Sequence, residues 1–156
     1  MVAAYANDNW SQPDLQPARE DLNLTLENVT VDTFVQNLQE NITTDSLDFD
    51  IQVLNGDSSK LGKKDFKHDV NIIFYDGDNS EHKMREFFLN MMDFTEDVFT
   101  LVVDDANIQE NVAITKRFID AMGLKVLYER ELLNDQEDIS MWWNGLYVVV
   151  LSKSGL

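Results

Sequence analysis

The sequence predicts an open α/β sheet of about six strands, twisted and mostly parallel, with helices on both faces and an antiparallel last strand. Three observations support this prediction. Short apolar runs alternate with segments of helical periodicity along most of the 156 residues. Several of the apolar runs are followed at once by polar turn formers rich in aspartate and asparagine. The last two apolar runs are joined by an acidic loop instead of a helix, as antiparallel neighbours can be.

Six segments are predicted as strands. Residues 2–6 are small and apolar and are stopped by the polar residues 7–9. Residues 49–54 alternate between apolar and polar side chains, which is the period of a half-buried strand. Residues 69–75 are almost continuously apolar, as in a strand buried on both faces of a parallel sheet. The remaining strands are predicted at residues 99–103, 124–128 and 146–151.

Three segments have the spacing of amphipathic helices. Thr30 and Ser80 are the predicted N-caps of the first two, and Gly123 is the predicted residue that ends the third. Residues 12–28 contain both prolines and are predicted as a loop. The apolar positions of the three helices are, in chain order, Val31, Phe34, Val35, Leu38 and Ile42; Met84, Phe87, Phe88 and Met91; and Ile108, Val112, Ile119 and Met122, with Thr115 on the same face.

Composition excludes several classes of protein. Lysine and arginine number 12 against 29 aspartates and glutamates, a formal net charge of -17, so nucleic acid and anionic membrane surfaces are poor partners. The absence of cysteine excludes disulfide scaffolds, thiol catalysis and cysteine-ligated metals. No apolar run is long enough to span a bilayer, and no secretory signal is visible. We therefore expect a cytoplasmic protein with a single domain over residues 1–156.

Acidic side chains follow the predicted strands. Asp8 ends the first strand and Asp57 the second, Asp76 and Asp78 follow the third, and Asp104-Asp105 follow the fourth. In an open α/β sheet, ligands bind outside the carboxyl ends of the strands, so these side chains are expected to converge there. A group of carboxylates suits a hard divalent cation such as Mg²⁺. Aspartate is also common at such turns because it caps helices, and a purely structural explanation stays open.

Taken in order, the strand ends resemble class I S-adenosylmethionine-dependent methyltransferases, and most closely the small, metal-dependent O-methyltransferases. Residues 4–11 are similar to the second strand of that family and its acidic turn, and residues 55–58 to the end of its third strand. Residues 73–80 resemble the fourth-strand motif, residues 102–106 the fifth-strand motif, and residues 143–151 the last strand. The resemblance covers nearly the whole chain.

The resemblance implies a Rossmann-like fold, S-adenosylmethionine as cofactor and a small-molecule methyl acceptor. By position, Asp8, with Asn9 and Trp10 beside it, would hold the ribose of the cofactor. Asp57 and Ser58 would lie near its adenine. The acids that hold a divalent cation in metal-dependent members correspond to Asp76, Asp104 and Asp105, and the candidate catalytic residues are Asp76 and Asp78.

Two departures from the family pattern stand out. The sequence contains no Gly-x-Gly, so the first strand and glycine-rich loop of the family have no counterpart, and the domain is expected to be truncated at its N-terminus relative to that family. Asn79 and Glu81 stand where many relatives have histidine and tyrosine, and His68 and His82 lie in polar surroundings typical of exposed residues. Without the first strand, residues 2–6 are expected to pair beside residues 70–75, or a partner chain or second protomer to cover the gap.

Two other readings stay open. A haloacid dehalogenase-type phosphohydrolase would use Asp76 as nucleophile and Asp78 as acid/base. Asp104 and Asp105 would be the metal-binding acids that come late in the sequence of that family. The short stretch between Asp76 and Asp104 leaves no room for that family's intervening motifs. The second alternative is a non-catalytic interaction subunit, for which the apolar positions around Phe88 could form a partner face, although packing on the protein's own sheet is the simpler expectation.

Overall fold

A computed structural model describes residues 2–8, 32, 36, 49–134 and 144–154. The chain divides into two compact units, Met1–Ser58 and Ser59–Leu156, and each is described by itself. The single domain expected from the sequence stays a prediction.

The first unit contains two parallel strands. β1 (Val2–Asp8) pairs with β2 (Phe49–Asn55) in a register that sets Val2 beside Phe49 and Asp8 beside Asn55. Both predicted strands are therefore confirmed. The predicted loop 12–28 lies outside the described residues, as does the helix at 30–42 except for Asp32 and Gln36, which are helical and exposed.

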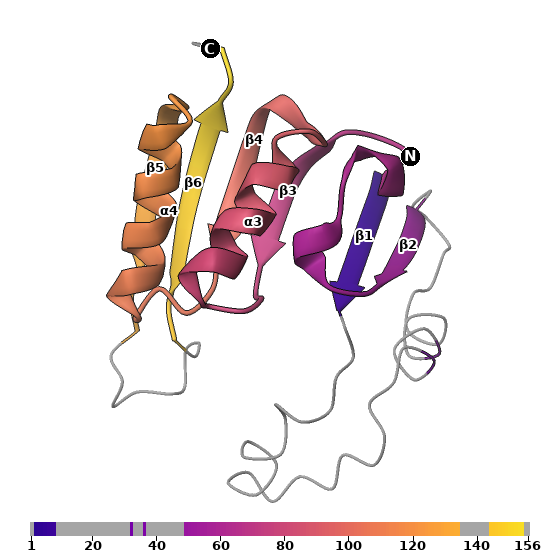
Figure 1. Ribbon diagram of the computed structural model, residues 1–156, viewed down its shortest axis with the longest axis horizontal. Coiled ribbons are helices and arrows are strands. Elements are labelled where there is room, and N and C mark those ends of the chain that lie inside the picture. Colours follow the sequence, from indigo (N-terminus) through magenta and orange to yellow (C-terminus); the bar gives the residue numbers. More distant parts are fainter. Residues whose placement is uncertain (1, 9–31, 33–35, 37–48, 135–143, 155–156) are drawn as a thin grey trace, which may run out of the picture. The chain divides into compact units, whose positions relative to one another are not determined.

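The second unit is built on a four-stranded sheet in the order β3-β4-β6-β5 (Figure 1). β3 (Val70–Tyr75) and β4 (Thr95–Val103) are parallel, while β6 (Leu146–Ser152) runs antiparallel to both β4 and β5 (Lys125–Leu132). The antiparallel last strand is thus confirmed. β4 begins earlier and β5 ends later than the sequence predicts, because strand pairing extends through charged residues that carry no apolar signal. Two short 3₁₀ turns, η2 (Ser58–Lys60) and η3 (Lys63–Asp65), precede β3.

Both described helices of this unit lie on one face of the sheet (Figure 1). α3 (Glu81–Met91) begins after Ser80, and α4 (Gln109–Ala121) is followed by Gly123 with φ 64°, as the sequence predicts. The rings of Phe88 on α3 and Phe118 on α4 are 5.3 Å apart, so the helices contact each other over the sheet.

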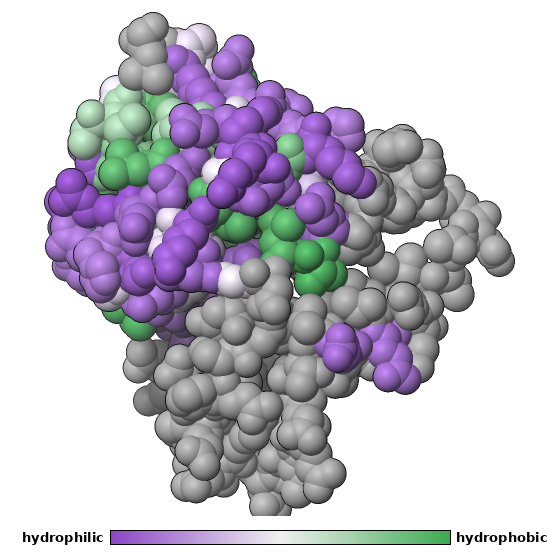
Figure 2. Space-filling view, turned by 45° about the vertical axis from the view of Figure 1, so that its right-hand side comes forward, coloured by the Kyte–Doolittle hydropathy of each residue, from purple (hydrophilic) through white to green (hydrophobic). Residues whose placement is uncertain are grey.

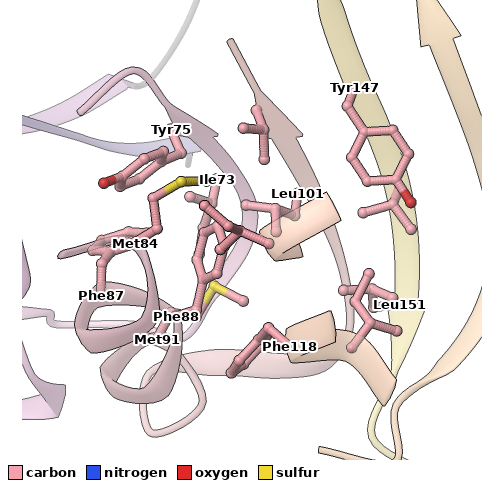
Figure 3. Packing of buried hydrophobic residues seen from close by; sticks show 14 of the residues in the cluster. Ile73, Tyr75, Met84, Phe87, Phe88, Met91, Leu101, Phe118, Tyr147 and Leu151 are labelled. Atoms are coloured by element: carbon pink, nitrogen blue, oxygen red, sulfur yellow. The ribbon is translucent and has the colours of Figure 1, made fainter. Parts of the chain in front are cut away.

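The core lies between this helix layer and the sheet (Figure 3). Met84, Phe87, Phe88 and Met91 are all buried, which confirms that the apolar stripe of α3 packs on its own sheet and is not a partner face. Three strands of the sheet, β3, β4 and β6, each contribute one side to this core, while no β5 residue is buried. The buried apolar residues of the three strands are Ile73 and Tyr75 on β3, Phe99, Leu101 and Val103 on β4, and Tyr147, Val149 and Leu151 on β6.

The opposite face of this sheet is apolar but exposed. The prediction that β3 is buried on both faces is wrong: Ile72 is 64% and Phe74 58% exposed, because both helices lie on the other side. Ile72, Thr100, Val150 and Tyr128 form a row across the four strands, and Tyr128 is 51% exposed. The predicted coverage of both faces by helices is therefore not shown by the described residues.

On the face that Figure 2 shows, most of the described surface residues are hydrophilic, as expected for an excess of acidic side chains. Among the described residues, no helix is both long and apolar enough to cross a membrane.

Replacing Phe88 by alanine should destabilise the protein by about 3–5 kcal/mol, because a fully buried ring would leave a cavity between the two helices and the sheet. The neighbouring Leu89 is 51% exposed on the same helix, and Leu89→Ala should change the free energy of unfolding by about 0.5 kcal/mol or less. Urea denaturation of both variants measures this. Equal effects would mean that α3 does not pack as described.

Candidate functional site

The carboxyl ends of β3 and β4 meet at one edge of the four-stranded sheet. Tyr75 and Val103, the last residues of the two strands, are partners in the sheet. The backbone N–H of Asp104 donates to the carbonyl of Tyr75 at 2.9 Å, which places the residues after both strands next to each other. Asp76 and Asp104 are therefore close in the backbone, and the convergence of the three carboxylates stays a prediction.

The loop from β3 to α3 closes over the ring of Tyr75. A Cβ atom at Gly77 would lie 2.9 Å from the Tyr75 ring, so only glycine allows the backbone this close. The hydroxyl of Tyr75 donates to the carbonyl of Asp78 at 2.8 Å. Because the tyrosine ring is buried in the core, this contact fixes the loop to the core.

Asp78 has a structural role at the start of α3. Its carboxylate accepts a hydrogen bond from the backbone N–H of Ser80 at 2.8 Å, while the Ser80 side chain makes no capping hydrogen bond to the helix. The Ser80 backbone hydrogen bond is the largest cause of a lowered pKa of Asp78, with the Ser80 hydroxyl next. The sequence predicted the N-cap at Ser80 correctly. It did not reveal that the carboxylate of Asp78, two residues earlier, accepts the hydrogen bond from the Ser80 backbone N–H. A lowered pKa also makes Asp78 a poor proton donor.

Asp105 joins three loops. Its backbone has φ 56°, and its two carboxylate oxygens accept hydrogen bonds from the side-chain amides of Asn79, at 2.7 Å, and Asn144, at 2.6 Å. Its carbonyl also accepts a longer hydrogen bond from the Asn111 amide at 3.3 Å. We call Asp105, Asn79 and Asn144 the Asp105 clasp. Sequence reasoning noticed Asn79 only as a departure from histidine and missed Asn144.

Asn107 holds both ends of the connection between β5 and β6. Its side-chain amide donates to the carbonyl of Asn134 at 3.0 Å and its side-chain oxygen accepts from the Asn134 backbone N–H at 3.1 Å. Its own backbone N–H donates to the carbonyl of Asn144 at 2.7 Å, and Ala106 makes the adjacent bond to Gly145. The loop after β4 is thus fastened to the residues on either side of segment 135–143, which lies outside the described residues together with Trp142 and Trp143.

In the first unit, the predicted cofactor-binding positions also share one edge. Asp8 ends β1 beside Asn55, the last residue of β2, and Asp57 lies two residues after that strand. The Asn7 amide donates to the carbonyls of Leu54 at 2.7 Å and Gly56 at 3.1 Å and so fixes the turn that leads to Asp57 and Ser58. Nothing lies within 4 Å of where a Cβ of Gly56 would be. Asn9 and Trp10 lie outside the described residues.

The described acids do not fit a metal ion. Among the residues that the structure describes, no group of three or more histidine, aspartate or glutamate side chains is arranged to hold one. Asp105, one of the three predicted ligands, already uses both carboxylate oxygens for amide hydrogen bonds. Asp76 and both histidines are exposed, so the expected exposure of His68 and His82 is confirmed.

A separate cavity of about 860 Å³ lies at the amino ends of β3 and β4, away from the predicted site. Its walls carry both signs of charge, including Lys63, Lys67, Glu96 and Asp97. Lys63 and Asp69 form an ion pair within it. Sequence reasoning made no prediction for this region.

No protein-family model and no curated protein matches the sequence. The fold does match solved structures. One is the protein PH1948 of Pyrococcus horikoshii, provisionally assigned as an RNA methyltransferase, with a TM-score of 0.53 and 17% identity over 96% of this chain and 74% of that one. Another is the precorrin-6y C5,15-methyltransferase of Geobacter metallireducens, with a TM-score of 0.52 and 14% identity over 97% of this chain and 80% of that one.

These two likenesses show the fold. The chain has a Rossmann-like α/β fold of the kind found in methyltransferases, with a four-stranded sheet of which one strand is antiparallel. Identities this low carry no residue roles, so the candidate site depends on the geometry of this chain.

Gly145→Ala should destabilise the protein by about 1–3 kcal/mol, because the position needs a left-handed backbone. Its φ is 73°, and an added Cβ would lie 2.5 Å from the Asn107 side-chain oxygen and 2.9 Å from the Leu132 carbonyl. Gly62 has φ -150° and nothing within 4 Å, so Gly62→Ala is the matched control, with an expected change of about 0.5 kcal/mol or less. Chemical denaturation compares the two, and equal stabilities would contradict the strained turn.

Asp78→Ala should lower stability at neutral pH by about 0.5 kcal/mol, at the low end for a capping acceptor because the carboxylate is exposed. The Ser80 hydrogen bonds hold the pKa of folded Asp78 below the ordinary aspartate value, so the stabilisation is present above that ordinary value and is lost as the pH falls through the lowered pKa. The stability difference between wild type and Asp78→Ala should therefore shrink on acidification. Asp93→Ala, at an exposed position after α3, is the control. A stability difference between wild type and Asp78→Ala that stays constant down to the lowest pH would refute the structural role of Asp78.

Proposed function

We propose that the chain binds S-adenosylmethionine at the carboxyl ends of its strands and transfers the methyl group to a small molecule. The proposal rests on the sheet order β3-β4-β6-β5 with an antiparallel β6. It also rests on the positions of Asp76 and Asp104, which follow two neighbouring strands at the same edge of the sheet. The likeness to two methyltransferase structures supports it. The prediction that residues 2–6 pair beside residues 70–75 in one six-stranded sheet belongs to this proposal.

The residues proposed to hold the cofactor are Asp8, Asn9 and Trp10 after β1, and Asp57 and Ser58 after β2. The chemistry of this set fits, since a carboxylate accepts two hydrogen bonds from the adjacent hydroxyls of a ribose. The open space beside Gly56 leaves room at the same edge. We expect binding in the micromolar range.

When bound, S-adenosylmethionine supplies an electrophilic methyl group. Of the two candidate catalytic acids, Asp76 is exposed at the end of β3, whereas the Asp78 carboxylate accepts a backbone hydrogen bond in the loop before α3. Asp76 would orient the acceptor by taking a hydrogen bond from its hydroxyl or amine. The acceptor itself is a small molecule, since the net charge disfavours a nucleic acid.

Metal-dependent O-methyl transfer is the finer version of this function. It would need Asp76, Asp104 and Asp105 to share a divalent cation. That arrangement requires Asn79 and Asn144 to release Asp105, because both of its oxygens accept amide hydrogens. We therefore propose cofactor binding without a metal and keep Mg²⁺ as one arm of the test.

A second candidate function, a non-catalytic interaction subunit, is favoured by the exposed apolar face of the four-stranded sheet. Ile72, Phe74 and Tyr128 are each more than half exposed on that face. An apolar patch of this kind on a soluble protein is typical of a contact surface. The partner would be a second copy or another chain.

Titration calorimetry with S-adenosylmethionine, with and without Mg²⁺, tests the proposed function. We expect micromolar binding that Asp8→Ala abolishes and that does not depend on Mg²⁺. Asp93→Ala is the matched control because Asp93 precedes the amino end of β4, at the opposite edge of the sheet, and should leave binding unchanged.

Absence of binding together with a stable dimer in sedimentation velocity would favour the interaction subunit. Release of phosphate from a generic phosphoester, lost in Asp76→Asn, would instead favour the phosphohydrolase. Binding that requires Mg²⁺ and is lost in Asp105→Asn would restore the metal-dependent version.

A further inference from the structure

The last member of the Asp105 clasp, Asn144, is followed by a glycine. The sequence contains two Asn-Gly pairs, Asn55-Gly56 and Asn144-Gly145. Asn-Gly is chemically labile because glycine has no side chain to hinder attack by its backbone nitrogen on the preceding asparagine. In the second pair, the Asn144 side chain donates a hydrogen bond to the carboxylate of Asp105.

Three observations place this pair where reaction has a structural consequence. Asn144 is exposed, so water can reach it. Its amide nitrogen lies 2.6 Å from Asp105 Oδ1, and this hydrogen bond ties the residue before β6 to the loop after β4. Both Asn144 and Gly145 have a positive φ, 61° and 73°, so the turn is held in a backbone conformation that an ordinary residue disfavours.

We infer that Asn144 is a site of spontaneous deamidation, and that the reaction opens the Asp105 clasp. The backbone nitrogen of Gly145 attacks Cγ of Asn144, the new C–N bond closes a five-membered imide, and the bond from Cγ to Nδ2 breaks with loss of ammonia. Water then adds to one of the two imide carbonyls, the bond from that carbon to the ring nitrogen breaks, the nitrogen regains its proton, and the product is either aspartate or isoaspartate. No oxidant or reductant takes part.

The product cannot keep the clasp. An amide donates hydrogen bonds, but a carboxylate only accepts them, so the bond to Asp105 is lost. Two carboxylates would face each other over the former hydrogen-bond distance and repel. The isoaspartate product also lengthens the backbone by one atom at this turn. The carbonyls of Asn144 and Gly145 accept hydrogen bonds there from the backbone N–H groups of Asn107 and Ala106.

The hydrogen bond to Asp105 also controls the reaction. While it is formed, the Asn144 side chain is held toward Asp105, and cyclisation proceeds from the moments when the clasp is open. Loss of Asp105 should therefore speed deamidation. The proposal does not depend on the function proposed above.

The test is incubation of the purified full chain at mildly alkaline pH and physiological temperature, followed by peptide mass mapping. We expect the mass of the peptide that contains Asn144 to increase by the difference between a carboxyl and an amide group. Asp105→Ala should raise the rate of this increase severalfold, while the rate of deamidation at Asn55 should stay unchanged. Asn144→Gln should abolish the gain, because glutamine closes a less favoured six-membered ring. Absence of any mass gain at Asn144, or equal rates with and without Asp105, would overturn the proposal.

A second measurement stands even if Asp105→Ala does not fold. Asn144→Asp copies the product, and we expect its Tm to fall by roughly 4–8 °C. Asn71→Asp adds the same charge at an exposed position of β3 in the same unit and should keep the wild-type Tm. If Asn144→Asp melts with the wild type, the clasp is not lost on deamidation and the inference fails.

Discussion

The packing of α3 and α4 against one face of the four-stranded sheet is the constraint on which the rest of the second unit depends. The contact of Phe88 with Phe118 brings the helices together, and the inward side chains of β3, β4 and β6 complete a one-sided core. Tyr75 carries this packing into the candidate site, since its ring is buried while its hydroxyl holds the carbonyl of Asp78. The loop before α3 is therefore placed by the core and not by its own sequence alone.

At this edge of the sheet, two carboxylates are held by hydrogen bonds from neighbouring neutral groups. Asp105 is held by two neutral amides, and Asp78 by a backbone N–H. Hydrogen bonds to an ionised acceptor are among the stronger ones in proteins, and they compensate the carboxylate locally. A row of acids after strands is thus ambiguous in a sequence, because the same residues serve as metal ligands in one context and as loop fasteners in another.

Apolar runs and helical periodicity were enough to predict the two described helices of the second unit and the six strands, and the loop between the last two strands predicted the direction of the last one. These patterns failed where a strand contains charged residues, and they did not show which face of the sheet an apolar side chain occupies. Glu96 and Asp97 gave no sign that β4 begins at Thr95, and the apolar run of β3 could not reveal that Ile72 and Phe74 face away from the helices. The clasp was beyond prediction because Asp105 and Asn144 are 39 residues apart in the sequence, and only the folded chain brings their side chains together.

The fastening of Asn134 and Asn144 by Asn107 has a consequence for how this chain could change over evolution or be engineered. With both ends of the connection pinned, residues between them can be added or removed without shifting the pairing of β5 with β6. Doubling the length of a flexible loop costs only about 0.6 kcal/mol of closure entropy. The connection is therefore a natural place to insert a foreign peptide or a small domain.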